Sequence, residues 1–237
     1  ALFDLEEENQ IFEKDGLDAY YKYQLENEDK SLKKGTGYRL VENILKINSF
    51  FSSDERQVEV IILSKNNAAT SLRITNAIND LKLDIIRSAW TSGTNISNYL
   101  KAFKVDLFLS ADDNDVLNAI ENGVAAAKIL HSNENIHNIS NEQVRIAFDG
   151  DAVLFSEESE LVYKNHGLEA FIEHEKENRN NPLEMGPFAK LLLTIAKIQA
   201  KFPTDKSPIR TALVTARSAP THERVIKTFN LWGVRVD

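Results

Sequence analysis

Cysteine is absent from the 237 residues, and methionine occurs once. The lack of cysteine excludes disulfides, thiolate nucleophiles and zinc–thiolate sites, and it fits a reducing, cytoplasmic compartment. No apolar run approaches the roughly 20 residues that a membrane-spanning helix needs. The first residues also lack the basic and apolar order of a secretory signal. We therefore expect a cytoplasmic protein with no membrane partner.

Basic residues are outnumbered, because 28 Lys and Arg stand against 36 Asp and Glu, a net charge of -8. Binding a nucleic acid polymer requires several Lys or Arg to displace counterions from phosphates, so this balance argues against such a partner. Hydrophobic residues make up 42% and charged residues 27%, which excludes disorder as a description of the whole chain. These counts leave the oligomeric state, including a homo-oligomer, open.

The chain repeats itself at an offset of 151 residues. Of the 33 positions in 16–48, 11 are identical to those in 167–199, with no gap. The same offset relates the apolar residues of 74–81 to those of 225–232. Both segments have the i, i+3, i+4, i+7 spacing of one buried helix face. We interpret the sequence as two copies of one unit.

The two predicted units are 1–140 and 141–237. Near their starts, a shift of six residues pairs Phe3 and Asp4 with Phe148 and Asp149. Residues 84–140 of the first unit have no counterpart in the second. We therefore expect the second unit to be truncated at its C-terminus, and the chain to be a fragment of a longer protein.

Strands and helices alternate along both units. The predicted strands cover 58–64, 85–90, 105–109, 144–149 and 210–215, and the predicted helices 17–25, 40–45, 74–81, 116–130 and 225–232. This alternation predicts an α/β fold with parallel, doubly wound sheets and helical insertions. Ligands of such sheets bind beyond the carboxyl ends of the strands.

Two carboxylates, Asp149 and Asp151, follow the apolar strand of the second unit. Spaced two apart, they can face one pocket, and Gly150 between them allows a tight backbone path. Because close like charges split their proton affinities, one can act as nucleophile while the other holds a proton. A turn that caps the strand is the structural alternative.

Thr215 ends the next strand, and Arg217 follows it. A hydroxyl group near the N–H groups of a helix start suits a phosphate oxygen. We therefore predict that Thr215 and Arg217 bind phosphate. An N-cap role for Thr215 is the alternative.

This order of motifs resembles the haloacid dehalogenase (HAD) superfamily of phosphohydrolases. The longer strings, 147–156 and 214–219, look like those of the type I cytosolic 5'-nucleotidases, as do 1–4 and 107–112. The resemblance implies two tandem HAD/Rossmann-like units. It also implies Mg²⁺-dependent hydrolysis of nucleoside 5'-monophosphates, AMP prominent among them, to nucleoside and phosphate.

By position, the resemblance gives each site residue a role. Asp149 would attack phosphorus and form an aspartyl-phosphate, Asp151 would act as acid and then base, and Thr215 would hold the phosphoryl group. The Asp149 carboxylate and the Asp151 backbone carbonyl would bind Mg²⁺. Phe155, Tyr163 and Phe171 could stack on a base, but their pattern favours packing in the core.

The sequence departs from the superfamily pattern after Thr215, because no phosphate-facing Lys and no acidic pair follow. The first unit offers candidates for all stations: Asp4, Ser64, Lys101, Asp112 and Asp113. Its first station is weakened, because Glu6 stands where the acid/base Asp should be. We expect the second unit to be the active one and treat the first as degenerate. The rival hypothesis is a catalytically inactive pseudo-phosphatase that binds nucleotides or acts as a scaffold.

Overall fold

The computed structural model describes residues 1–67, 70–130 and 143–236. The predicted boundary at 140 and 141 lies outside the described residues. The chain divides into two compact units, and each is described by itself.

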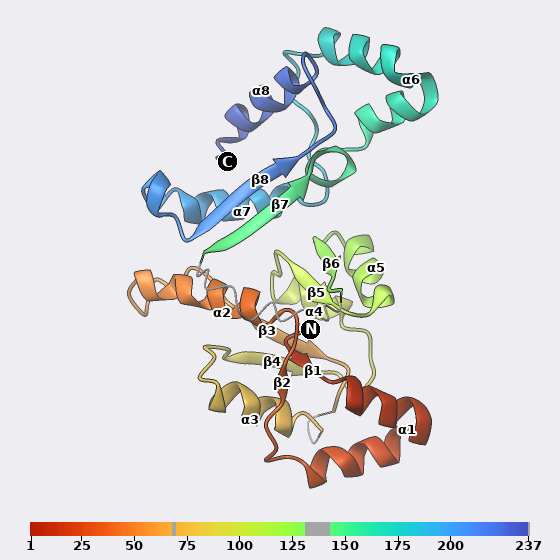
Figure 1. Cartoon of the computed structure of the whole chain (residues 1–237), viewed down its shortest axis with the longest axis vertical. Coiled ribbons are helices and arrows are strands. Elements are labelled where there is room, and N and C mark those ends of the chain that lie inside the picture. The colour runs from red at the N-terminus through yellow and green to blue at the C-terminus, as the bar shows by residue number, and fades with distance from the viewer. Residues whose placement is uncertain (68–69, 131–142, 237) are drawn as a thin grey trace. The chain divides into compact units, whose positions relative to one another are not determined.

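The first unit contains β1 (Phe3–Asp4), α1 (Glu6–Glu26), β2 (Lys33–Lys34), α2 (Tyr38–Lys46), a short helical turn (Ile47–Phe50), β3 (Ile61–Ser64), α3 (Leu72–Asp80), β4 (Arg87–Trp90), α4 (Ser97–Ala102), β5 (Phe108–Ser110), α5 (Asp113–Glu121) and β6 (Ala126–Lys128) (Figure 1). The second contains β7 (Val144–Asp149), a single wide turn (Gly150–Leu154), α6 (Glu158–Glu177), α7 (Ala189–Gln199), a short turn (Thr204–Lys206), β8 (Ile209–Val214) and α8 (His222–Trp232).

The strands pair mostly in parallel. β3 pairs with β4, β5 with β6, and β7 with β8, each in parallel. At least one helix lies between the partners along the chain in every case, because parallel neighbours need a long crossover connection. The α/β class with parallel strand pairs is therefore confirmed. β1 and β2 differ from that expectation, since they pair antiparallel with Phe3 opposite Lys34.

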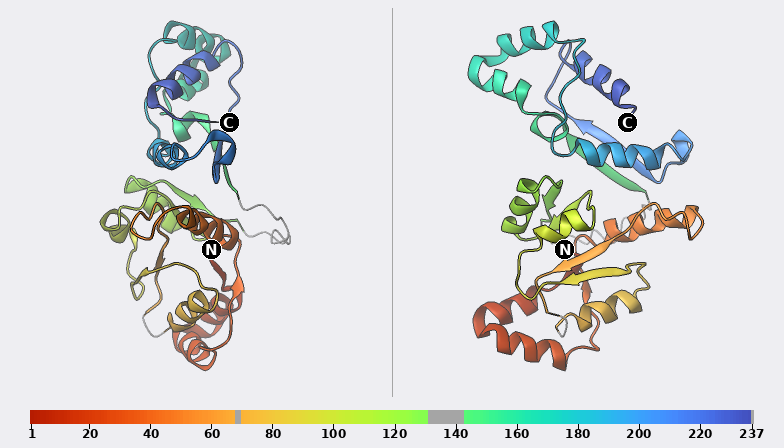
Figure 2. Two further views of the ribbon diagram at one scale, coloured as in Figure 1. Left: turned by 90° about the vertical axis from the view of Figure 1, so that its left-hand side faces the viewer. Right: turned by 180° about the vertical axis from the view of Figure 1, so that it is seen from behind.

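Both long helices bend at a glycine. In α1 the bend lies at Gly16 and in α6 at Gly167, each with φ 83°. This left-handed value suits glycine, which has no Cβ. Figure 2 shows each helix changing direction along its length. The helix predicted over 17–25 is therefore the second arm of α1, although Leu17 is 62% exposed.

The buried helix faces lie where the spacing predicts them. In α3, Ile74, Ala77 and Ile78 pack with Phe3 and Leu32 in one hydrophobic cluster. The equivalent residues of α8 are also buried: Val225, Thr228 and Phe229.

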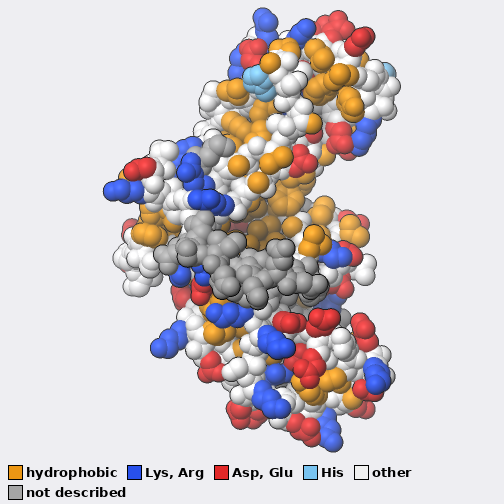
Figure 3. Space-filling view, viewed as in Figure 1, with side chains coloured by type: hydrophobic (Ala, Val, Ile, Leu, Met, Phe, Trp, Pro, Cys, Tyr) orange, Lys and Arg blue, Asp and Glu red, His pale blue; other side chains and the backbone are white. Residues whose placement is uncertain are grey.

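The second unit has an aromatic core around Phe155, which is fully buried. Its ring centroid lies 5.5 Å from that of Phe229 and 5.8 Å from that of Trp232. Phe155 therefore packs in the core, as predicted. Figure 3 shows hydrophobic side chains also gathering over α6, where Leu161 and Leu168 are exposed.

The helix predicted over 116–130 is shorter than expected. α5 ends at Glu121, and β6 follows in parallel with β5. Gly123 has φ 75°, the left-handed conformation that commonly ends helices. That glycine explains why Val124 lies outside α5. Within the described part of the chain, no helix is long and apolar enough to cross a bilayer.

Candidate active site

β7 and β8 bring the predicted nucleophile and the predicted phosphate-binding residues to one edge of their sheet. Asp149 ends β7 and lies opposite Val214, the last residue of β8, so Thr215 follows directly beside it. The Asp149 side chain is exposed and Thr215 is half-buried. A Cβ added to Gly150 would lie 3.4 Å from Thr215 Oγ1. The two strand ends therefore meet, as the parallel arrangement predicts.

The wide turn Gly150–Leu154 determines where Asp151 lies. Asp149 Oδ1 accepts a hydrogen bond from the Gly150 N–H at 2.7 Å, and the Phe155 N–H donates to the Gly150 carbonyl at 3.0 Å. Ala152 has φ 59°, a left-handed conformation that costs a non-glycine residue about 1 kcal/mol. Such strain concentrates at functional sites.

The turn after Asp149 does not depend on a glycine at position 150. Its φ is not left-handed, and an added Cβ would meet the nearest atoms at 3.4 to 3.5 Å, an ordinary contact distance. The backbone path between the carboxylates therefore does not need glycine at this position, and the unusual φ falls on Ala152 instead.

Thr215 is held by a local turn. Its Oγ1 accepts a hydrogen bond from the Arg217 N–H at 3.2 Å. Since the hydroxyl oxygen only accepts in this turn, its O–H group can donate to a phosphate oxygen. α8 begins at His222, so Thr215 does not lie at the helix start that the sequence suggested. The same turn recurs at Ser64 and Ser110 in the first unit.

Arg217 bridges two carboxylates. Its Nε donates to Asp151 Oδ2 at 3.0 Å and Oδ1 at 3.2 Å, and its Nη2 donates to Oδ1 at 2.5 Å. Its Nη1 donates to Glu175 Oε2. Burial works against the charged guanidinium, but the hydrogen bonds and charges of Asp151 and Glu175 outweigh it and raise the pKa of Arg217. The Arg217 side chain is 2% exposed, so its contacts are with these carboxylates rather than with an open phosphate site.

Sequence reasoning missed Glu175 and Arg224. The Glu175 side chain is 0% exposed, and its Oε1 accepts from Arg224 Nη1 at 3.0 Å and from Ser159 Oγ at 2.7 Å. A buried carboxylate of this kind must be paired and hydrogen-bonded. Arg224 recurs at the repeat offset as Arg73, and that identity is the signal that could have identified it.

Two aromatic residues of α6 pack around this network. The Phe171 ring centroid lies 5.3 Å from Arg217 Cζ, a favourable cation–π arrangement. Tyr163 meets the Phe171 ring edge-on at 6.2 Å and is 53% exposed. Phe171 therefore packs against Arg217, whereas the core packing that the sequence favoured for Tyr163 is wrong.

The donor set at Asp149 suits a hard cation in part. Mg²⁺ is usually held by one or two carboxylates, with waters and substrate phosphate oxygens completing its shell. The Asp149 carboxylate is exposed, and the contact to Gly150 uses one of its oxygens. Across 1–67, 70–130 and 143–236, no three His, Asp or Glu side chains gather into a metal site. These residues therefore fit a site completed by substrate and water rather than a preformed cage.

The candidates of the first unit have structural contacts of their own. Asp112 caps α5 by accepting from the Asp115 N–H at 2.8 Å, and Asp113 pairs with Lys128 at 2.8 Å. In the part of the chain that the structure describes, no hydrogen bond or ion pair joins any two of the five candidates, Asp4, Ser64, Lys101, Asp112 and Asp113.

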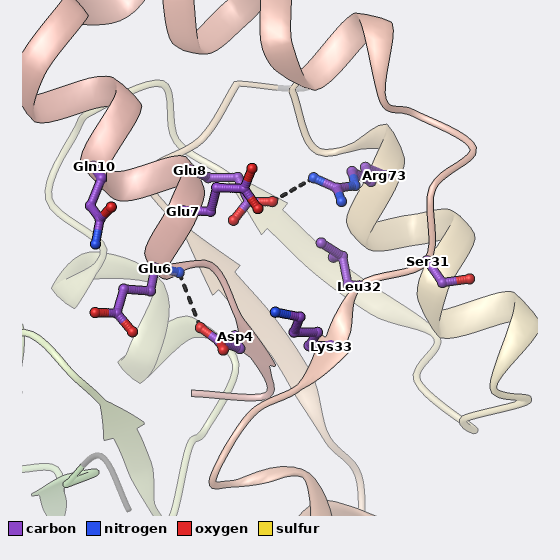
Figure 4. Close-up of a pocket in the computed structure, with 9 residues that line it drawn as sticks. All are labelled: Asp4, Glu6, Glu7, Glu8, Gln10, Ser31, Leu32, Lys33 and Arg73. Carbon is purple, nitrogen blue, oxygen red and sulfur yellow. Dashed lines mark hydrogen bonds and ion pairs between the residues drawn. The ribbon is translucent and has the colours of Figure 1, made fainter. Parts of the chain in front are cut away.

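Asp4 lines a separate cavity of about 280 Å³. Figure 4 shows acidic side chains from the start of α1 around it, together with Lys33 from β2 and Arg73 from α3. Asp4 Oδ1 accepts from the Glu6 N–H at 3.1 Å, and Arg73 forms a buried ion pair with Glu8. Asp4 therefore makes a local contact with the first residue of α1.

The pairing of Asp4 with Asp149 is wrong. The Gly35 N–H donates to the Leu2 carbonyl at 2.9 Å, and the Gly186 N–H donates to the Leu154 carbonyl at 2.9 Å. Since Gly35 and Gly186 correspond at the repeat offset, Leu2 corresponds to Leu154. Asp4 then corresponds to Ser156, which follows the nucleophile motif. The first-unit alternative therefore loses its proposed nucleophile.

Comparisons with known proteins agree with the motifs. A family model described as 5'-nucleotidase matches residues 1–237. Human cytosolic 5'-nucleotidase 1B is 35% identical over 246 residues, which cover 100% of this chain and 40% of that protein. The chain thus spans well under half the length of this curated relative. No solved structure matches the chain significantly. The chain belongs to the 5'-nucleotidase family, and the resemblance to its type I cytosolic members that the motifs predicted is confirmed.

Proposed function

We propose that this chain carries the nucleophile of a cytoplasmic 5'-nucleotidase that hydrolyses nucleoside 5'-monophosphates such as AMP. Family membership supports the reaction class. One observation carries the proposal: Asp149 and Thr215 meet at the adjacent ends of two parallel strands. Asp151 lies in the turn that directly follows Asp149. This edge is where ligands of parallel sheets bind.

The reaction proceeds in two steps, formation of an aspartyl-phosphate and its hydrolysis. Asp149 attacks phosphorus, the bond from phosphorus to the ribose oxygen breaks, and Asp151 gives that oxygen a proton. Asp151 then takes a proton from water as the water oxygen attacks phosphorus, and the bond from phosphorus to Asp149 breaks. Thr215 donates its O–H group to a phosphoryl oxygen in both steps.

Mg²⁺ would be held by the Asp149 carboxylate and the Asp151 backbone carbonyl. When bound, it supplies positive charge near the phosphoryl oxygens. The demand for such charge is large, because uncatalysed hydrolysis of phosphate monoesters is among the slowest reactions that enzymes accelerate.

The test measures phosphate release from a panel of nucleoside monophosphates, with Mg²⁺ and with chelator. It uses this chain and a longer form of the protein that contains it. Asp149→Asn should reduce turnover about 10⁴-fold or more. The matched variant Asp4→Asn should retain turnover, because Asp4 corresponds to Ser156. Tight nucleotide binding without turnover in every form would instead support the inactive pseudo-phosphatase.

A further inference from the structure

Both oxygens of the Asp151 carboxylate accept hydrogen bonds from one guanidinium group. Arg217 holds both of its oxygens with a two-nitrogen fork, and the Asp151 side chain is 25% exposed. Oδ1 accepts from two guanidinium nitrogens and Oδ2 from one. Oδ2 therefore has more capacity to accept a further hydrogen bond, since each carboxyl oxygen has two lone pairs.

The guanidinium is itself fixed from behind. Glu175 accepts from Arg217 Nη1 with one oxygen and is held through the other by Arg224 and Ser159. Phe171 covers the guanidinium face. Such support fixes the orientation of the guanidinium and, through it, that of the Asp151 carboxylate.

We call the contacts of Arg217 with Asp151 and Glu175 the clamp. The first unit has a buried arginine at the repeat offset but, in the part that the structure describes, lacks these contacts. Arg73, the counterpart of Arg224, donates from Nε to the Lys30 carbonyl at 2.9 Å, as Arg224 donates to the Asn181 carbonyl at 2.8 Å. Arg73 also has a buried carboxylate partner, Glu8. The buried arginine and its carboxylate therefore occur in both units.

Among the described residues, the contacts of Arg217 with Asp151 and Glu175 have no equivalent in the first unit. At the repeat offset, Asn66 stands in place of Arg217, Gln24 in place of Glu175, and Glu8 in place of Ser159. The first unit thus keeps its buried arginine paired through Glu8 and forms the same hydroxyl turn at Ser64 with asparagine at the next position but one. An arginine at 217 is therefore not required for this local fold.

We propose that Arg217, supported by Glu175, is a positioning residue that orients the Asp151 carboxyl group toward the leaving ribose oxygen. The inference rests on the proposed function and assigns Arg217 a task other than phosphate binding. Loss of the clamp leaves Asp151 free to rotate about its side-chain bonds. A misplacement of about 1 Å at such a group can cost about 100-fold in rate.

The test compares two substrates in an active form of the protein. AMP needs a proton on its leaving oxygen, whereas p-nitrophenyl phosphate releases a stable phenolate without one. Because hydrolysis of the aspartyl-phosphate is common to both substrates, the readout is kcat/KM, which reports only the step that expels the leaving group. Arg217→Asn, which installs the residue of the first unit, should lower kcat/KM for AMP about 100-fold and kcat/KM for p-nitrophenyl phosphate less than about fivefold. Asp151→Asn should show the same dependence on the leaving group.

A second variant separates the clamp from the charge network. Ser159→Glu with Glu175→Gln transplants the arrangement of the first unit, so Arg224 keeps a carboxylate while Arg217 loses its support. This double variant should also lower kcat/KM more for AMP than for p-nitrophenyl phosphate, but by a smaller factor than Arg217→Asn does. Arg217→Lys, which keeps the charge without the fork, should be intermediate. Exposed Arg179→Asn serves as the matched control and should leave both rates unchanged.

Three results would overturn the inference. Equal losses for both substrates would indicate a merely structural role. A rise in KM for AMP together with weaker inhibition by inorganic phosphate, at unchanged kcat, would indicate direct phosphate binding by Arg217. Wild-type rates in Arg217→Asn would show that the clamp is unnecessary. The proposed function fails separately, through activity that survives Asp149→Asn or through no turnover in any form, and the inference then falls with it.

Discussion

Replacing Gly186 with alanine should destabilise the second unit, because its backbone lies against the nucleophile turn and Phe155, which follows it. A Cβ at Gly186 would lie 2.3 Å from the Phe155 carbonyl oxygen and 2.5 Å from that of Val153. Carbon and oxygen atoms normally approach no closer than about 3.3 Å. The two segments must therefore move apart by about 1 Å.

That displacement strains the hydrogen bonds that join the segments. The Gly186 N–H donates to the Leu154 carbonyl at 2.9 Å, Ser156 to Glu184 at 2.9 Å, and Phe188 to Val153 at 3.0 Å. Each backbone hydrogen bond contributes about 1 kcal/mol. We therefore expect a loss of about 3 kcal/mol in the free energy of unfolding, at the upper end for overpacked sites.

The assay is urea unfolding followed by tryptophan fluorescence, because each unit has one tryptophan. Trp232 reports the second unit in a Trp90→Phe background, and Trp90 reports the first in a Trp232→Phe background. Gly35→Ala is the matched control, since its Cβ would lie 2.5 Å from the Ala1 carbonyl oxygen. It should shift the Trp90 transition and leave that of Trp232 in place.

A change of less than about 0.5 kcal/mol in the Trp232 transition of Gly186→Ala, the usual range of surface substitutions, would contradict this expected loss. Equal shifts of the Trp90 and Trp232 transitions would show that the two units unfold together.

Three further predictions concern charge and backbone. Arg73→Met should cost about 3 to 5 kcal/mol in urea unfolding, because it leaves Glu8 buried without its partner, and the double variant with Glu8→Leu should recover most of that loss. Hydrogen bonds from Arg87 lower the pKa of Glu59 below its ordinary 4.5, against a smaller opposing effect of burial. The stability that this pair contributes is therefore present above pH 4.5 and lost as the pH falls through the lower folded pKa, so the advantage of wild type over Glu59→Gln in urea midpoint should shrink steadily as the pH is lowered below 4.5. Gly150→Ala should cost less than about 1 kcal/mol in the same assay, since its Cβ makes only ordinary contacts; a larger loss would contradict the contact distances.

The sequence by itself determined the strand ends and the helix faces. Apolar runs closed by Asp149 and Thr215 gave β7 and β8, and parallel pairing then placed both residues at one edge. The spacing at 74–81 and 225–232 gave the buried faces of α3 and α8. These features depend on local periodicity, which each segment carries in its own residues.

Only the tertiary structure decided where the charges point. Arg217 meets Asp151 across 66 positions of the chain and Glu175 across 42, so no local pattern reveals that its guanidinium turns to carboxylates. The same holds for Asp4, whose place beside Lys33 depends on the pairing of β1 with β2. A buried charge takes the partner that the folded chain brings to it, because leaving it unpaired costs several kcal/mol.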